Sequence, residues 1–87
     1  MFKWNADKGK KLQEERGIDL NKIVSLIQSE QYFIVDVKNQ DDHPNQKMYV
    51  VNLDGYPTCV PFVKESNGDI FFKTAFQNRR MKESNHG

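Results

Sequence analysis

Cysteine and histidine are scarce in this sequence. Cys59 is the single cysteine, and His43 and His86 are the only histidines in 87 residues. One cysteine cannot form an intramolecular disulfide or the cysteine cluster of a structural zinc site. No glycine-rich phosphate-binding loop is present either. We therefore expect a cytoplasmic protein that carries no cofactor and no metal ion.

Long apolar runs and an excess of one charge are also lacking. No run approaches the roughly 20 apolar residues of a membrane-spanning helix, and the first residues lack the apolar stretch of a signal peptide. Thirteen basic and twelve acidic residues leave a net charge of +1. This charge does not by itself indicate a nucleic-acid partner, because binding by counterion release needs a concentrated basic surface. We expect no membrane association.

The residues that are present suit one small globular domain. Hydrophobic residues make up 37% of the chain and aromatic residues 11%, enough for a modest core. Chains divide into separate cores only far above this length. The sequence predicts a single domain over residues 1–87, in which residues 83–87 form a frayed tail.

The first third of the chain predicts two helices. Phe2 and Trp4 alternate in a short extended entry, and Asn5 can cap a helix over residues 6–16 that ends at Gly17. Asp19 can cap a second helix. Apolar residues follow it at helical spacing and form a single stripe, namely Leu20, Ile23, Val24 and Ile27.

From residue 33 the apolar period changes to that of strands. Strands are predicted over residues 33–37, 48–53, 56–63 and 69–76, with a polar loop over residues 39–46. Asp54-Gly55 and Asn67-Gly68 each match a type I′ hairpin turn. The predicted fold class is α+β: two N-terminal helices packed on a four-stranded antiparallel meander sheet, with a short C-terminal helix or tail.

Two prolines lie four residues apart in the third predicted strand. The missing N–H groups of Pro57 and Pro61 belong to the same strand edge, which should face the last strand. We expect a bulge or irregular pairing there. One interpretation is that this irregularity opens a groove between strands, and the alternative is simple protection of a sheet edge.

The most function-like feature is the cationic segment Lys73 to Lys82. Alternation predicts Phe72 and Phe76 on one strand face and Lys73 and Ala75 on the other. Just past the strand, Arg79 and Arg80 can present guanidinium groups to phosphate oxygens. Aromatic residues, Tyr49, Tyr56 or Phe76, can stack on unpaired bases. The alternatives are that these cations only solvate a C-terminal helix or tail and that Tyr49 only packs.

The order of several motifs resembles BrnT-type toxins. The start of the chain matches their aromatic-x-Trp-Asp/Asn-x-x-Lys opening, and the first helix ends in a basic residue, Gly and Ile. The last strand and the basic stretch after it are also similar to the family's C-terminal part. The matching residues are Phe2, Trp4, Asn5, Lys8, Arg16, Gly17, Ile18 and Ile70 to Ala75. These dispersed positions cover residues 2–83.

The resemblance implies a RelE-like fold and a ribonuclease toxin that arrests translation. Its implied partners are an RNA substrate and a cognate antitoxin protein. Such cleavage needs a proton acceptor, a proton donor and cations where negative charge grows. Toxins of this superfamily commonly use Lys, Arg and Tyr for these roles, with few histidines or carboxylates. The matching positions suggest Arg16, Lys73, Arg79 and Arg80 for phosphate binding. For proton transfer we expect Tyr49 or His43 to assist, although neither belongs to the matching positions.

One position departs from the family pattern. Phe76 stands where the family has an arginine directly after the small-Ala pair. Either Arg79 takes over the phosphate-binding role, or the catalytic cation is absent and the domain binds without cutting. The second possibility predicts a non-catalytic module that binds another protein or a nucleic acid.

Overall fold

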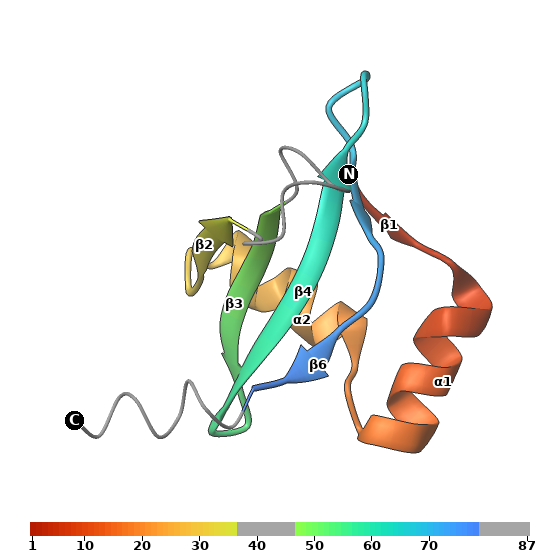
Figure 1. The fold of residues 1–87 in the computed structure, drawn as a ribbon, viewed down its shortest axis with the longest axis vertical. Helices are drawn as coiled ribbons and strands as arrows, with labels where there is room; N and C mark the ends of the chain where they lie inside the picture. The colour runs from red at the N-terminus through yellow and green to blue at the C-terminus, as the bar shows by residue number, and fades with distance from the viewer. Residues whose placement is uncertain (37–46, 79–87) are drawn as a thin grey trace.

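A computed structural model describes residues 1–36 and 47–78. Within these ranges the chain is α+β, with two helices packed against a mostly antiparallel sheet of six strands (Figure 1). The helices are α1 (Ala6–Arg16) and α2 (Leu20–Gln28). The strands are β1 (Phe2–Trp4), β2 (Phe33–Asp36), β3 (Lys47–Leu53), β4 (Tyr56–Lys64), β5 (Ile70–Phe72) and β6 (Phe76–Gln77). In the described ranges, neither helix is long and apolar enough to cross a membrane.

Local capping contacts set the ends of both helices, as the sequence predicts. The Asn5 side chain caps α1 by accepting a hydrogen bond from the Lys8 amide at 3.1 Å. Asp19 caps α2 in the same manner. Gly17 has a φ of 67°, the left-handed conformation that commonly terminates a helix. The position of Gly17 therefore makes Arg16 the last residue of α1.

The sheet differs from the predicted four-stranded meander. Its strand order is β1-β5-β4-β3-β2, and β6 pairs with β4 beyond the end of β5. The extended entry forms β1, which runs parallel to β5, while the other described pairs are antiparallel. The prediction of four antiparallel strands is wrong on both counts. A three-residue alternation indicates an extended backbone but carries no information about its partner.

The two glycine-containing turns have different geometries. Asp54 and Gly55 have φ values of 54° and 89°, which confirms the predicted type I′ turn between β3 and β4. Between β4 and β5 only Gly68 has a positive φ, and its amide donates to the Glu65 carbonyl at 2.9 Å. This is a type I turn followed by a left-handed glycine, so the second predicted type I′ turn is wrong. The Asn67 side chain instead accepts from an amide two residues on.

The core lies between the helices and one face of the sheet, called here the helix face. In Figure 1, α2 passes behind β3 and β4 and covers this face. Leu20, Ile23 and Ile27 of the predicted stripe are buried there, and Val24 packs at the margin. The other buried members of the core cluster are Leu12, Ile18, Tyr49, Val51, Leu53, Val60, Phe62, Phe72 and Ala75.

Intervening strand residues point to the other side of the sheet, called here the opposite face. Val50 and Cys59 pair across β3 and β4 on this face and are both buried. Met48 and Pro61 form the next pair and are half-buried. The opposite face is therefore also largely apolar, which is why both sets of alternate positions in β3 and β4 are rich in hydrophobic residues.

The parallel strand β1 is attached by aromatic packing and by charge. The rings of Phe2 and Trp4 lie 5.6 and 5.8 Å from the Phe72 ring, measured between centroids. The Asp69 carboxylate accepts from the Lys3 ammonium at 2.8 Å and from the amino group of Met1 at 3.1 Å. These contacts link the first strand to the β4–β5 turn, across nearly the whole described sequence.

The Asp69 contacts predict a specific acid sensitivity. Lys3, together with the amino group of Met1, lowers the pKa of Asp69 from 3.8 to about 2. Because the folded-state pKa is depressed, the associated stabilisation is present above about pH 4 and is lost as the pH falls toward 2. We expect Asp69→Asn to flatten the pH dependence of the free energy of unfolding in this window, as measured by urea denaturation. Glu14→Gln, which removes an exposed carboxylate from α1, should keep the wild-type slope, and equal slopes in all three proteins would contradict the prediction.

Candidate functional site

The strand predicted over residues 69–76 is interrupted between β5 and β6. Phe72 pairs with Phe62 on β4, whereas Phe76 pairs with Cys59. Two residues of β4, 60 and 61, therefore lie opposite three residues, 73–75, of the other strand. The extra residue forms a β-bulge, which shifts the pairing register by one residue. The prediction of one continuous strand is wrong, while the predicted irregular pairing is confirmed.

Both prolines of β4 face this interrupted strand. The Pro61 carbonyl accepts from the Lys73 amide at 2.8 Å, and the Pro57 carbonyl accepts from the Asn78 amide at 2.9 Å. A strand residue directs its N–H and C=O to the same side, so the missing proline N–H groups also face residues 73–78. Each hydrogen bond that is missing between the two strands lowers their net stabilisation by about 0.5–1.5 kcal/mol. Opposite residues 73–78, Cys59 is the one residue of β4 that can offer an amide, since the residues that face this segment are 57, 59 and 61.

The register shift changes which side chains enter the core. Phe72 and Ala75 both belong to the core cluster on the helix face, although they are three residues apart. Phe76 pairs with Cys59 on the opposite face. The predicted grouping of Phe72 with Phe76 is therefore wrong, because simple alternation cannot include the extra residue of a bulge.

Arg16 contacts the bulge from the end of α1. Its Nη1 donates to the Ala75 carbonyl at 2.8 Å, across 59 residues of sequence. The backbone N–H of Asn78 points toward β4. Because the backbone groups of successive strand residues point to opposite sides, the carbonyl of Ala75, three residues earlier, points away from β4. A hydrogen bond to a charged group contributes about 1.5–3 kcal/mol. This one contact is therefore comparable to the ladder bonds that the two prolines forgo.

Lys73 lies in the same segment as Ala75 but on another side of it. Its backbone is held by Pro61, and its exposed side chain follows Phe72, so it points to the opposite face. Arg16 instead binds the Ala75 carbonyl, which points away from β4. Two of the predicted site residues, Arg16 and Lys73, thus meet at one irregular segment from different directions.

Tyr49 lies apart from these cations, on the helix face. It is 7% exposed, and its ring stacks on Phe62 with centroids 4.3 Å apart. Edge contacts with the rings of Phe2, Tyr32 and Phe72 surround it. Burial, with a contribution from Tyr32, raises the pKa of the Tyr49 hydroxyl above 10.0. This position matches the packing interpretation of Tyr49.

Three of the predicted site residues fall outside the described ranges. They are His43, Arg79 and Arg80, and the C-terminal helix or tail and the frayed residues 83–87 fall there as well. The segment 73–78 leads directly into Arg79 in the sequence. The described part of the candidate site therefore consists of Arg16, Lys73 and the bulge between β5 and β6.

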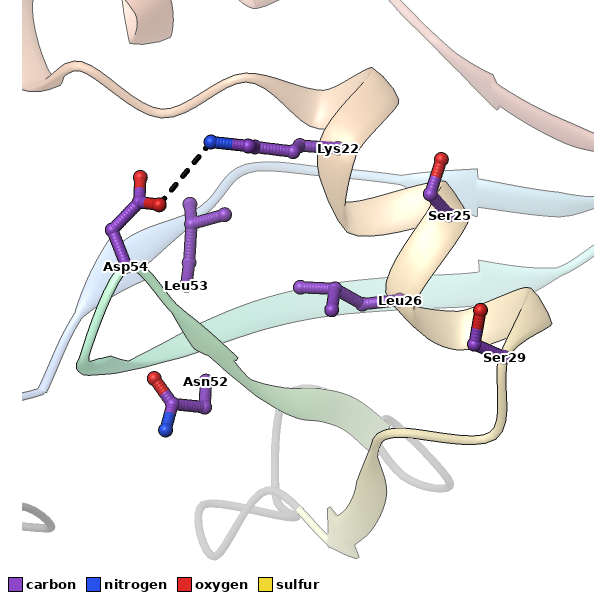
Figure 2. Close-up of a pocket in the computed structure, with 7 residues that line it drawn as sticks. All are labelled: Lys22, Ser25, Leu26, Ser29, Asn52, Leu53 and Asp54. Atoms are coloured by element: carbon purple, nitrogen blue, oxygen red, sulfur yellow. Dashed lines mark hydrogen bonds and ion pairs between the residues drawn. The ribbon is translucent and has the colours of Figure 1, made fainter.

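A separate pocket lies between α2 and the β3–β4 turn (Figure 2). Its volume is about 240 Å³, and none of the six predicted site residues lines it. Figure 2 shows Lys22 extending from α2 toward Asp54, with which it forms an exposed ion pair at 3.2 Å. Leu26 and Leu53 supply its apolar surface. An exposed ion pair beside two leucines indicates no particular ligand chemistry.

Sequence reasoning missed the role of Ala75 and the structural contact of Arg16. The spacing of Pro57 and Pro61 signals an irregular strand pair, but it does not show which residue becomes the extra one. The acceptor for Arg16 is a backbone carbonyl, which every residue type has. No side-chain pattern can therefore identify this contact.

Comparison with known proteins finds no matching family model, no similar curated protein and no similar solved structure. The resemblance to BrnT-type toxins therefore depends on the sequence positions that carry it.

The packing of Tyr49 predicts opposite results for two substitutions. Tyr49→Phe keeps the ring and should change the free energy of unfolding by less than about 1 kcal/mol, whereas Tyr49→Ala should lower it by about 3–5 kcal/mol. Urea denaturation of both variants measures the difference. Any RNA cleavage by the wild type should persist in Tyr49→Phe. A folded Tyr49→Phe protein that loses cleavage would restore Tyr49 as a proton-transfer group.

Proposed function

We propose that this chain is the ribonuclease toxin of a toxin–antitoxin pair, with a RelE-like fold, and that it cleaves RNA without a metal ion. The observation that carries the proposal is the contact between Arg16 and Ala75. It joins the basic end of α1 to the segment that contains Lys73 and leads into Arg79 and Arg80. Arg16 and Lys73, which are far apart in the sequence, thereby meet at one segment, and this supports the proposal because a phosphate-binding site needs basic residues from several parts of the chain.

The proposed reaction is attack of a ribose 2′-OH on the adjacent phosphate. A base accepts the 2′-OH proton as the new bond to phosphorus forms, the bond from phosphorus to the 5′ oxygen of the next nucleotide breaks, and this oxygen takes up a proton and leaves as a 5′-OH. Negative charge grows on the phosphate oxygens as the new bond forms, and fixed cations stabilise it. Lys73, Arg79 and Arg80 supply these cations, with Arg16 at the border of the site. Tyr49 is buried, so of the two candidates for proton transfer we assign the role to His43, because an imidazole ring can both accept and donate a proton.

Removal of the two arginines after β6 tests the proposal. Arg79→Ala/Arg80→Ala should lower the single-turnover rate of RNA cleavage by about a hundredfold or more, because even one phosphate-binding charge contributes about 3 kcal/mol to the transition state. The wild-type products should carry 2′,3′-cyclic phosphate ends. A 2′-deoxy nucleotide at the cleavage position should block the reaction, and a metal chelator should not.

Lys10→Ala/Lys11→Ala is the matched control for this experiment. It removes the same charge from exposed positions of α1 and should retain the wild-type rate. Purified wild-type protein that leaves RNA intact, under conditions in which it is folded, would refute the catalytic proposal.

A second candidate function is partner binding without cleavage, and the exposure of β2 favours it. β2 is an edge strand of the described sheet, and its Phe33 and Ile34 are 57% and 44% exposed. Leu53 and Tyr56, which flank the type I′ turn, direct their backbone groups toward each other. This direction alternates along β3, so the backbone groups of Tyr49 also face β4. The partner of Tyr49 on β2 is Ile34, and its amide therefore points away from β3. Such an edge suits an extended strand of a partner protein, which would pair with it through main-chain hydrogen bonds.

Ile34→Pro tests this surface without removing a bond between β2 and β3. With the product of the neighbouring reading frame as the probe, the variant should bind about tenfold more weakly than the wild type, because one main-chain hydrogen bond is lost. Titration calorimetry measures the affinity. Equal affinities would exclude β2 as the partner surface. Tight binding by a wild-type protein that neither cleaves RNA nor arrests growth would favour this second function over the first.

A further inference from the structure

The segment 73–78 has two possible registers against β4. If the register of β5 continued unchanged, Cys59 would pair with Ala75 and Thr58 with Phe76. In the structure Cys59 pairs with Phe76, and Thr58 pairs with Gln77. A one-residue slip moves every following side chain to the other face of a strand. The choice of register therefore decides on which face Phe76 lies.

β4 offers little to distinguish the two registers. Residues 57, 59 and 61 of β4 face the segment in both, and the prolines at 57 and 61 donate no hydrogen bond in either. Cys59 supplies one amide donor in both arrangements. The ladder itself is therefore nearly balanced, so contacts outside β4 must select the register.

Arg16 makes such a contact, and it makes it only in the bulged register. There the Ala75 carbonyl points away from β4 and accepts from Arg16 Nη1 at 2.8 Å. In the continued register the same carbonyl would face Cys59 and would be directed away from α1. The bulged register also places the small Ala75 side chain, which is fully buried, in the core on the helix face. In the continued register the much larger Phe76 would have to enter that side.

We propose that Arg16 is a positioning residue, whose hydrogen bond to the Ala75 carbonyl selects the bulged register of residues 73–78. This register decides on which face of the sheet the side chains of Phe76 and Asn78 lie, in the residues that come immediately before Arg79. Its consequence for RNA cleavage rests on the proposed function, but the selection of register does not. Arg16 then acts on the site through the backbone, rather than by binding phosphate itself.

The register can be measured directly and without RNA. Residues 58 and 77 form a pair without mutual hydrogen bonds, in which the two Hα atoms lie close together. The wild type should therefore show a nuclear Overhauser effect between Thr58 Hα and Gln77 Hα. In Arg16→Met, which keeps the apolar stem but no donor, this signal should weaken and a signal between Thr58 and Phe76 should appear.

The single cysteine gives a second readout of the same segment. Cys59 is fully buried and pairs with Phe76, and burial raises the pKa of its thiol, so the native thiol should react slowly with an aromatic disulfide reagent. We expect Arg16→Met to react about tenfold faster in the absence of denaturant, because a bond to a charged group is lost. Arg16→Lys, which retains a charged donor, should restore most of the protection. Lys11→Met, at an exposed position of α1, should react at the wild-type rate.

Three outcomes separate this inference from the proposed function. A folded Arg16→Met protein with the wild-type Overhauser effect and labelling rate would overturn the inference. If that protein also lost RNA cleavage, Arg16 would be a phosphate-binding residue and the proposed function would stand. A register change in Arg16→Met, together with a wild type that never cleaves RNA, would support the inference and refute the ribonuclease. If Arg16→Met does not fold, Arg16→Gln replaces it, because the glutamine side chain ends short of the Nη1 position. A wild-type labelling rate in Arg16→Gln would equally overturn the inference.

Discussion

The shortage of amide donors along one edge of β4 is the constraint on which the rest of the site depends. Pro57 and Pro61 both face the last part of the described sheet, and neither has an N–H group to give. A regular strand opposite them would gain little from continued pairing. The chain instead leaves β5, inserts an extra residue and pairs again as β6. The missing pairing leaves the two registers nearly balanced, so the contact of Arg16 with the Ala75 carbonyl can select the bulge that buries the Ala75 side chain.

The bulge in turn gives α1 a second contact, besides the burial of Leu12 in the core. Gly17 ends the helix directly after Arg16, and the guanidinium of Arg16 then lies within hydrogen-bond distance of the Ala75 carbonyl. A charged donor thereby binds a carbonyl that points away from β4 and that no amide of β4 could reach. The same contact brings a basic residue of the N-terminal half to the basic C-terminal segment, which a net charge of +1 would not suggest.

The features that the sequence predicted correctly are those set by neighbouring residues. Asn5, Asp19 and Gly17 cap their helices through contacts a few positions away, and Asp54-Gly55 forms its turn through its own backbone preference. Asn67-Gly68 is the instructive exception, since the same dipeptide type closes a different turn. There the Asn67 side chain forms a local hydrogen bond, which the dipeptide rule does not consider.

At the candidate site, only the irregular pairing could be predicted from the sequence. Pro57 and Pro61 indicate it, because the absence of an N–H group is a property of the residue itself. The register shift, the entry of Ala75 into the core and the partner of Arg16 depend on how three distant segments pack together. Likewise, the sequence placed Tyr49 in a strand, but only the packing of four other rings around it showed that it is buried. The helices, their ends and the defect in β4 can be predicted from the sequence, because these are local properties. How the defect is accommodated depends on tertiary packing, because the acceptor is a backbone carbonyl that no residue type identifies.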